Sequence, residues 1–105
     1  MTSVAIRFIG SSPRAEAIKP RFASAEIERG DVVLRSKLAS DRPLNDHIVW
    51  LWGILKPHRR FLGTHRLQGN GILCECEVSR GSIHLLPNGA EMLHLLGIEL
   101  VLKVH

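Results

Sequence analysis

The 105-residue sequence is poor in aromatic side chains, with no tyrosine, two tryptophans and three phenylalanines. Proteins that bind single-stranded nucleic acids stack bases on several aromatic rings, so the chain has little material for such a platform. Two cysteines are too few for the disulfide-rich scaffold of a small secreted protein. No apolar run approaches the roughly 18 residues that a membrane-spanning helix requires. These shortages argue against three classes of protein and leave a globular domain.

The first ten residues, MTSVAIRFIG, have no charged lead-in and no long apolar segment. We therefore expect no signal peptide and a cytoplasmic location, where thiols stay reduced. Hydrophobic residues make up 45% of the chain and charged residues 23%, as in ordinary globular domains. The length suits one core, so residues 1–105 are predicted to form a single domain with no membrane contact.

The net charge of +4 is unevenly spread. Residues 56–66, KPHRRFLGTHR, contain no acid, two histidines and four strong cations: Lys56, Arg59, Arg60 and Arg66. This basic segment is a candidate for binding nucleic acid or another anionic ligand. The alternative is a helix end that contacts only water.

Periodicity and turn residues predict eight elements. Alternation predicts strands over residues 4–9, 25–35 (bent at Arg29-Gly30-Asp31), 72–78, 83–86 and 98–105. Helical spacing predicts a short helix over 14–22, a long one from Pro43 to about Leu67 that Pro57 should interrupt, and one over 89–96. The order βαβαββαβ favours an α+β fold, with one largely antiparallel sheet of about five strands and helices on one face.

Local signals set the bounds of the last helix. Asn88 followed by Glu91 fits a capping box, in which the asparagine side chain would accept a hydrogen bond from a backbone N–H of the first turn. Gly97 follows the last apolar residues and fits a C-terminal cap.

Both cysteines lie in the stretch ILCECEV, where alternation places Cys74 and Cys76 on one face of a strand. A two-residue turn at Arg80-Gly81 would pair this strand with residues 83–86, so that the apolar sets coincide and His84 lies beside Glu77 on the other face. The thiols are then small core residues. A metal or redox role would need two further ligands on the apolar face, and none is visible.

Motifs for catalysis are absent from the sequence. Ser11 and Ser12 follow a strand but lack the glycine of a nucleophile elbow. The pair Glu91 and His94 has the closest helical spacing to a ligand pair, which is also common on solvated helices. We therefore expect no catalytic residue, no metal and no cofactor. The weakest hypothesis is an enzyme that uses His84 with Glu77.

A second stripe on the long helix lies away from its main apolar face and contains His47, Trp50, Ile54 and Phe61. Tryptophan is enriched in interface cores, which makes these residues candidates for a partner or dimer surface. The alternative is that the domain buries this helix on two sides.

The assembled pattern resembles a bacterial family catalogued as domain of unknown function 4279. The similar segments are IRFIG, Arg29-Gly30-Asp31, LRSKLASDRPLNDHIVWLWGILKP and IHLLPNGAEMLHLLGIELVLKVH. The family commonly has a tryptophan where Val32 or Val33 stands here. The resemblance implies no catalytic residues, and the association of some members with toxin–immunity loci implies an immunity-type role.

Together these observations predict a non-enzymatic protein-binding module, either an immunity-type protein or a homodimer. Nucleic-acid or anionic-ligand binding through residues 56–66 is the alternative.

Overall fold

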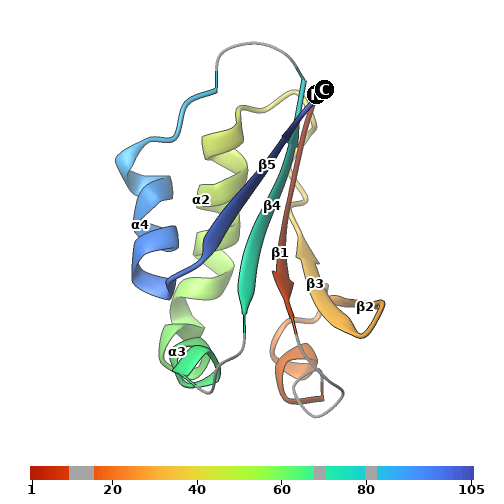
Figure 1. The fold of residues 1–105 in the computed structure, drawn as a ribbon, viewed down its shortest axis with the longest axis vertical. Helices are drawn as coiled ribbons and strands as arrows, with labels where there is room; N and C mark the ends of the chain where they lie inside the picture. The colour runs from red at the N-terminus through yellow and green to blue at the C-terminus, as the bar shows by residue number, and fades with distance from the viewer. Residues whose placement is uncertain (10–15, 68–70, 80–82) are drawn as a thin grey trace.

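The computed structural model describes residues 1–9, 16–67, 71–79 and 83–105, with the side chains of 65–67 left aside. The elements, in chain order, are β1 (Thr2–Phe8), η1 (Lys19–Arg21), β2 (Glu26–Glu28), β3 (Asp31–Arg35), α2 (Leu44–Leu55), η2 (Lys56–His58), α3 (Arg59–Leu67), β4 (Ile72–Val78), α4 (Pro87–Leu96) and β5 (Glu99–Val104). Figure 1 shows α2, α3 and α4 on one side of the sheet, and both chain termini at the same end. This confirms an α+β fold.

Within the described ranges, five strands form a mixed sheet in the order β2-β3-β1-β4-β5. The pairs β2–β3, β1–β3 and β1–β4 are antiparallel, whereas β4 and β5 are parallel. The parallel pair arises because α4 connects the two strands as a crossover. The prediction of about five largely antiparallel strands is therefore right for three of the four strand pairs, whereas the predicted element order βαβαββαβ matches the structure only loosely.

The predicted hairpin between residues 72–78 and 83–86 is wrong. Residues 83–86 form no strand, and β4 has β1 and β5 as its neighbours. The segment IHLL is only four residues long, because α4 begins directly after it at Pro87. The strands β1 and β5 are longer, with seven and six residues, and can therefore form more hydrogen bonds with β4. The fifth strand comes instead from the division of residues 25–35. The turn at Arg80-Gly81 lies outside the described residues.

The bend in residues 25–35 is a two-residue turn between β2 and β3. Arg29 has φ 54° and Gly30 has φ 85°. A hairpin turn of type I′ requires positive φ at both central residues, which glycine adopts freely and arginine rarely. Arg29 is therefore held in a left-handed conformation beside the open face of the sheet.

The long helix behaves as Pro57 predicts. The α2 helix ends at Leu55, residues 56–58 form a 3₁₀ turn, and α3 resumes at Arg59. At the chain's beginning, residues 16–18 are helical and continue into η1, which contains Pro20. Residues 14 and 15 of the predicted first helix lie outside the described residues.

Of the two predicted caps of α4, the C-terminal one is confirmed. Gly97 has φ 60° and its N–H donates to the carbonyls of His94 and Leu93, which confirms the C-terminal cap. The Asn88 side-chain oxygen accepts from the N–H of Gly89 at 2.9 Å, but the predicted capping box is wrong in position, because the helix begins at Pro87 and Asn88 lies inside its first turn. Asn45 of α2 supplies the missing acceptor instead. Its side-chain oxygen accepts from the N–H of Leu86 at 2.9 Å, and its amide donates to Asn88 Oδ1 at 2.9 Å.

The core lies between the helices and one face of the sheet. Cys74 and Cys76 are fully buried there, as predicted, but their partners across the sheet are Ile6 and Val4 of β1 rather than the predicted hairpin strand. The alternation of β4 alone was enough to place them. Their Sγ atoms are 3.8 Å apart, so the thiols contact each other without forming a disulfide.

We expect a thiol-alkylating reagent to label neither cysteine in the native protein and both after denaturation. Contact with Cys76 and burial raise the pKa of the Cys74 thiol, and burial also keeps reagents away. Mass spectrometry after timed labelling measures this. Native labelling at the rate of a free thiol would contradict the buried register of β4.

Candidate functional site

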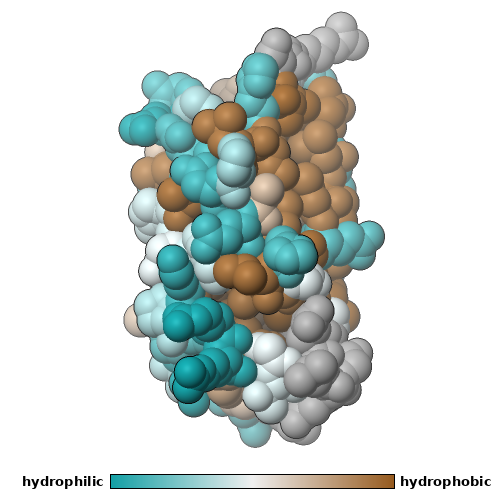
Figure 2. All heavy atoms as spheres, turned by 90° about the vertical axis from the view of Figure 1, so that its left-hand side faces the viewer, coloured by the Kyte–Doolittle hydropathy of each residue, from teal (hydrophilic) through white to brown (hydrophobic). Residues whose placement is uncertain are grey.

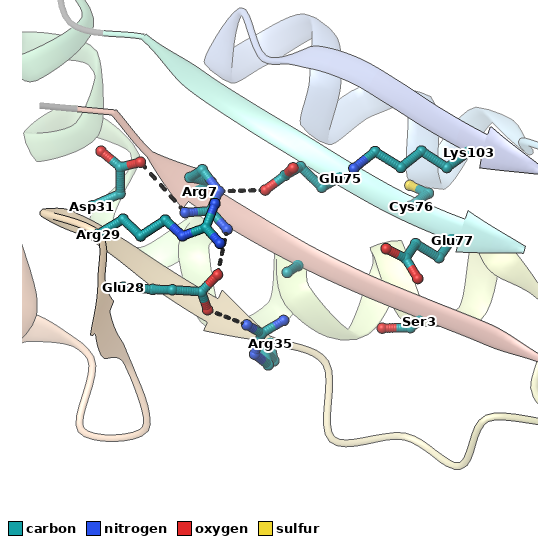
Figure 3. Close-up of a pocket in the computed structure, with 11 residues that line it drawn as sticks. Ser3, Arg7, Glu28, Arg29, Asp31, Arg35, Glu75, Cys76, Glu77 and Lys103 are labelled. Carbon is teal, nitrogen blue, oxygen red and sulfur yellow. Dashed lines mark hydrogen bonds and ion pairs between the residues drawn. The ribbon is translucent and has the colours of Figure 1, made fainter.

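The face of the sheet that the helices leave open carries a network of charges centred on Arg7 (Figure 3). Arg7 lies in the central strand β1, opposite Val33 of β3 and Leu73 of β4. Its guanidinium contacts Glu28 at 3.0 Å, Asp31 at 3.4 Å, and Glu75. One cation from the middle of the sheet therefore binds three carboxylates from three other strands.

The network fixes the charge of its members. The hydrogen bond from Arg7 holds the pKa of the Glu28 carboxyl below its usual value, and Arg35 adds to this effect. Hydrogen bonds to Glu75 and Glu28 raise the pKa of Arg7. Arg7 and Glu28 are therefore both ionised near neutral pH, as an ion pair requires.

A shallow cavity of about 510 Å³ lies over this network. Its lining holds four cations (Arg7, Arg29, Arg35 and Lys103) and four acids (Glu28, Asp31, Glu75 and Glu77). Because the two signs balance, the cavity has no excess charge to attract an anion or a cation. Ser3 is the lining hydroxyl, and no histidine lies with it in the lining.

The basic segment 56–66 lies on the exposed surface of η2 and α3, away from this cavity. Lys56 lies 3.9 Å from Glu91 of α4, and the Arg59 guanidinium donates to the Lys56 carbonyl at 3.0 Å. Arg60 is exposed, and the side chain of Arg66 lies outside the described parts. Two of the cations thus have partners within the chain.

The predicted partner stripe is divided by the fold. His47 is 1% exposed and belongs to the interior, so it is not a surface residue. Trp50, Ile54 and Phe61 are half-buried and pack against the core. Arg21 stacks over the Phe61 ring at 3.8 Å from its centre. Residues of the chain itself therefore cover part of this stripe.

His47 has a hydroxyl partner that the sequence did not suggest. Its Nδ1 lies 2.7 Å from the Ser36 Oγ, and its Nε2 has no hydrogen-bond partner among the described residues. A catalytic serine and histidine need a third group that orients the ring and an opening for substrate. This ring is buried and does not line the cavity over Arg7, so the pair lacks the opening that a substrate needs there.

His47 should make the protein less stable in mild acid. Burial lowers the pKa of this imidazole, while the carbonyls of Arg42 and Ala39 and the charge of Asp46 act the other way. The unfolded chain, with a pKa near 6.5, therefore binds a proton more readily than the native state. The stabilisation is present above about pH 6.5 and is lost as the pH falls below it, by at most about 1.4 kcal/mol per pH unit.

Urea titrations between pH 7.5 and 5 measure this slope. His47→Gln should flatten it, and His94→Gln, which replaces an exposed histidine of α4, is the variant with which it is compared. Equal slopes in the wild type and the His47 variant would show that the buried ring does not control acid stability.

The predicted pair of His84 and Glu77 is not formed. Glu77 lies opposite Ser3 and Lys103 in the sheet, and its carboxylate is 3.8 Å from His105 Nε2. His84 is exposed in the irregular segment 83–86. In the described part of the chain, no three His, Cys, Asp or Glu side chains are arranged so that they could hold a metal ion. No described helix is long and apolar enough to cross a membrane.

The most unusual surface is apolar and lies around the end of β5. Leu102 and Val104 are 41% and 54% exposed, although they share a face with the buried Cys76 and Val78. The α4 helix is about 15 Å long, whereas β5 is about 20 Å long. Because β5 starts at the C-terminal end of α4 and runs back along it, the last residues of β5 extend past the N-terminal end of the helix.

The segment just before α4 is also apolar and exposed. Its aliphatic side chains are Ile83, Leu85 and Leu86. Because β5 runs back along α4 after the reversal at Gly97, this segment and the end of β5 lie at the same end of the domain. Figure 2 shows broad apolar surface in the upper part of this side of the molecule. We name Ile83, Leu85, Leu86, Leu102 and Val104 the apolar end surface.

No family model matches the chain, and neither a curated protein nor a solved structure matches it.

Proposed function

We propose that this protein is a non-enzymatic protein-binding module whose binding element is β5 together with the apolar end surface. The observation that carries the proposal is the exposure of Leu86, Leu102 and Val104 at 41–54% in one region. Exposed aliphatic side chains that gather at one end of a domain are typical of surfaces that another polypeptide covers. The surface is distinct from the charged cavity around Arg7.

A catalytic function has less support. Three of the four acids in the charged cavity are paired with arginines, and the Ser36–His47 contact is buried. Nucleic-acid binding through the basic segment also has less support, because Lys56 and Arg59 have partners within the chain. The resemblance to family 4279 supports protein binding in general, since some members are associated with toxin–immunity loci.

Photocrosslinking tests the proposal. A benzophenone amino acid replaces Leu86 in one variant and Arg60, exposed on α3, in a control. We expect adducts of defined mass from position 86, either with the protein itself or with one other polypeptide, and none from position 60. Adducts from neither position, or equal and diffuse adducts from both, would contradict a binding surface at this end of the domain.

A titration against generic RNA and DNA at low and moderate salt tests the alternative. Phosphate contacts produce binding that weakens steeply with salt. The proposal predicts no binding at moderate salt. Salt-sensitive binding that disappears in an Arg59→Ala/Arg60→Ala variant would favour the basic segment instead.

A further inference from the structure

The two edges of the sheet are differently protected. At one edge, β2 is three residues long and carries Glu26 and Glu28, and short, charged edges resist pairing with another chain. At the other edge, β5 has six residues, no proline and an apolar centre, Leu100-Val101-Leu102. Such an edge is a template for another strand.

The backbone of β5 has free groups on its outer side. The N–H of His105 donates to the Val78 carbonyl at 2.9 Å, in continuation of the parallel ladder with β4. Backbone groups of alternate residues point to opposite edges of a strand. The N–H and C=O of Leu100, Leu102 and Val104 therefore face outward, and no described strand lies beyond them.

The side chains along β5 are self-complementary. Residues 98–104, IELVLKV, have Val101 at the centre, Glu99 two positions before it and Lys103 two positions after it. In an antiparallel pair of identical strands with Val101 opposite Val101, Glu99 of each lies opposite Lys103 of the other. Opposite charges in directly opposed positions stabilise a strand pair.

We propose that β5 pairs antiparallel with β5 of a second copy of this chain, about a two-fold axis at Val101, so that the two sheets become one. This inference rests on the proposed function and names its partner. A two-fold pairing has self-complementary contacts, as in most homodimers.

The backbone supports this register. Leu100 then lies opposite Leu102 of the second copy, and both have outward-facing N–H and C=O groups, as a hydrogen-bonded antiparallel pair requires. Moving the axis to residue 100 or 102 keeps the hydrogen bonds but places Val101 opposite Glu99 or Lys103. The axis at Val101 alone gives both backbone bonding and two opposite-charge pairs.

The pairing also explains exposed residues at the two ends of β5. Leu102 and Val104 lie beyond the cover of their own α4, whereas Leu95, 54% exposed, lies near the C-terminal end of α4. In an antiparallel pair, the end of one β5 lies beside the beginning of the other. Val104 of one copy is therefore level with Ile98 of the other, close to the helix end that carries Leu95.

Sedimentation equilibrium of the whole protein tests the pairing. We expect the wild type at about 100 µM to have twice the 11.7 kDa mass of the chain. Glu99→Lys places two lysines opposite each other at each end, and Lys103→Glu does so with two glutamates. Each should raise the dissociation constant about tenfold or more, and the double exchange should restore it to within about threefold.

A second variant is Leu102→Pro. It removes an outward N–H that β4 does not use, so the chain should fold by circular dichroism and sediment as a monomer. Residue 103 also lies opposite Glu77 of its own chain, so Lys103→Glu would add repulsion between two acids within one copy. The Glu99→Lys variant is therefore the better single change.

The outcomes separate this inference from the proposed function. A monomeric wild type with adducts from position 86 to another polypeptide overturns the pairing and keeps protein binding. A monomeric wild type without adducts overturns both. A dimer that neither Glu99→Lys nor Leu102→Pro weakens overturns β5 as the interface.

Discussion

Replacing Gly89 by alanine should lower the free energy of unfolding by about 3 kcal/mol, because the added methyl group has no room. A Cβ at this position would lie 2.3 Å from Asn45 Oδ1 and 3.1 Å from Leu85 Cδ1. Asn45 is buried and cannot move without losing its bonds to Leu86 and Asn88. The alanine therefore displaces the side chain that caps α4.

A matched control is Gly53→Ala. Gly53 lies inside α2 and is exposed, and a Cβ there has nothing within 4 Å. Alanine is a better helix former, so this variant should gain about 0.5–1 kcal/mol. Denaturant titration of both variants measures the difference. Similar stabilities would show that Asn45 is not held against Gly89.

Replacing Arg7 by methionine should lower the free energy of unfolding by about 2 kcal/mol at pH 7. The Arg7 side chain is 17% exposed, and its loss leaves Glu28, Asp31 and Glu75 close together without their shared cation. The acids are partly solvated, which keeps the loss below that of a fully buried ion pair. Methionine retains much of the apolar stem over the sheet.

The loss should shrink as the pH falls. Arg7 lowers the pKa of Glu28 in the native state, so this contribution is present above the unfolded pKa near 4.3 and disappears as the pH falls through the native value. Urea titrations at pH 7 and pH 3.5 compare the two conditions. Arg35→Met, whose guanidinium contacts Glu28 at an exposed position, should cost less than about 1 kcal/mol. A loss for Arg7→Met that is equal at both pH values would argue against electrostatics.

The parts of the fold that follow from local pattern could be predicted from the sequence. Alternation placed Cys74 and Cys76 on a buried face, Pro57 interrupted the long helix, and Gly97 ended α4. Each of these depends on residues within one or two turns or on one strand. The partners of those elements depend on distant residues, so no comparable local signal predicts the parallel pairing of β4 with β5.

The candidate site was harder to predict for the same reason. Arg7 contacts acids that are 21, 24 and 68 residues away in the chain. The cap of α4 comes from Asn45, 41 residues before Leu86. Helical spacing alone predicted that His47 lies on an outer stripe. Spacing does not show which side of a helix is covered by the segment before it, and here Ser36 of that segment contacts the His47 ring.

The residues that make β5 self-complementary are visible in the sequence, but their role in pairing can be inferred only when the order of the strands in the sheet is known. The alternation from Ile98 to Val104 predicts a strand, and its charges at positions 99 and 103 are symmetric about Val101. This symmetry has a consequence only if β5 is an edge strand with outward-facing backbone groups. The structure places it there.

The measurement that tests β5 pairing most directly is disulfide formation by Val101→Cys. The proposed pairing places residue 101 of one copy opposite residue 101 of the other in a non-hydrogen-bonded antiparallel pair. Their Cα atoms would be about 4.5 Å apart, within the range of a disulfide. The native thiols are buried and should not compete. We predict a disulfide-linked dimer on mild oxidation, while Arg59→Cys on exposed α3 gives little. A Val101→Cys protein that stays monomeric, or links no faster than the Arg59→Cys control, would contradict the account.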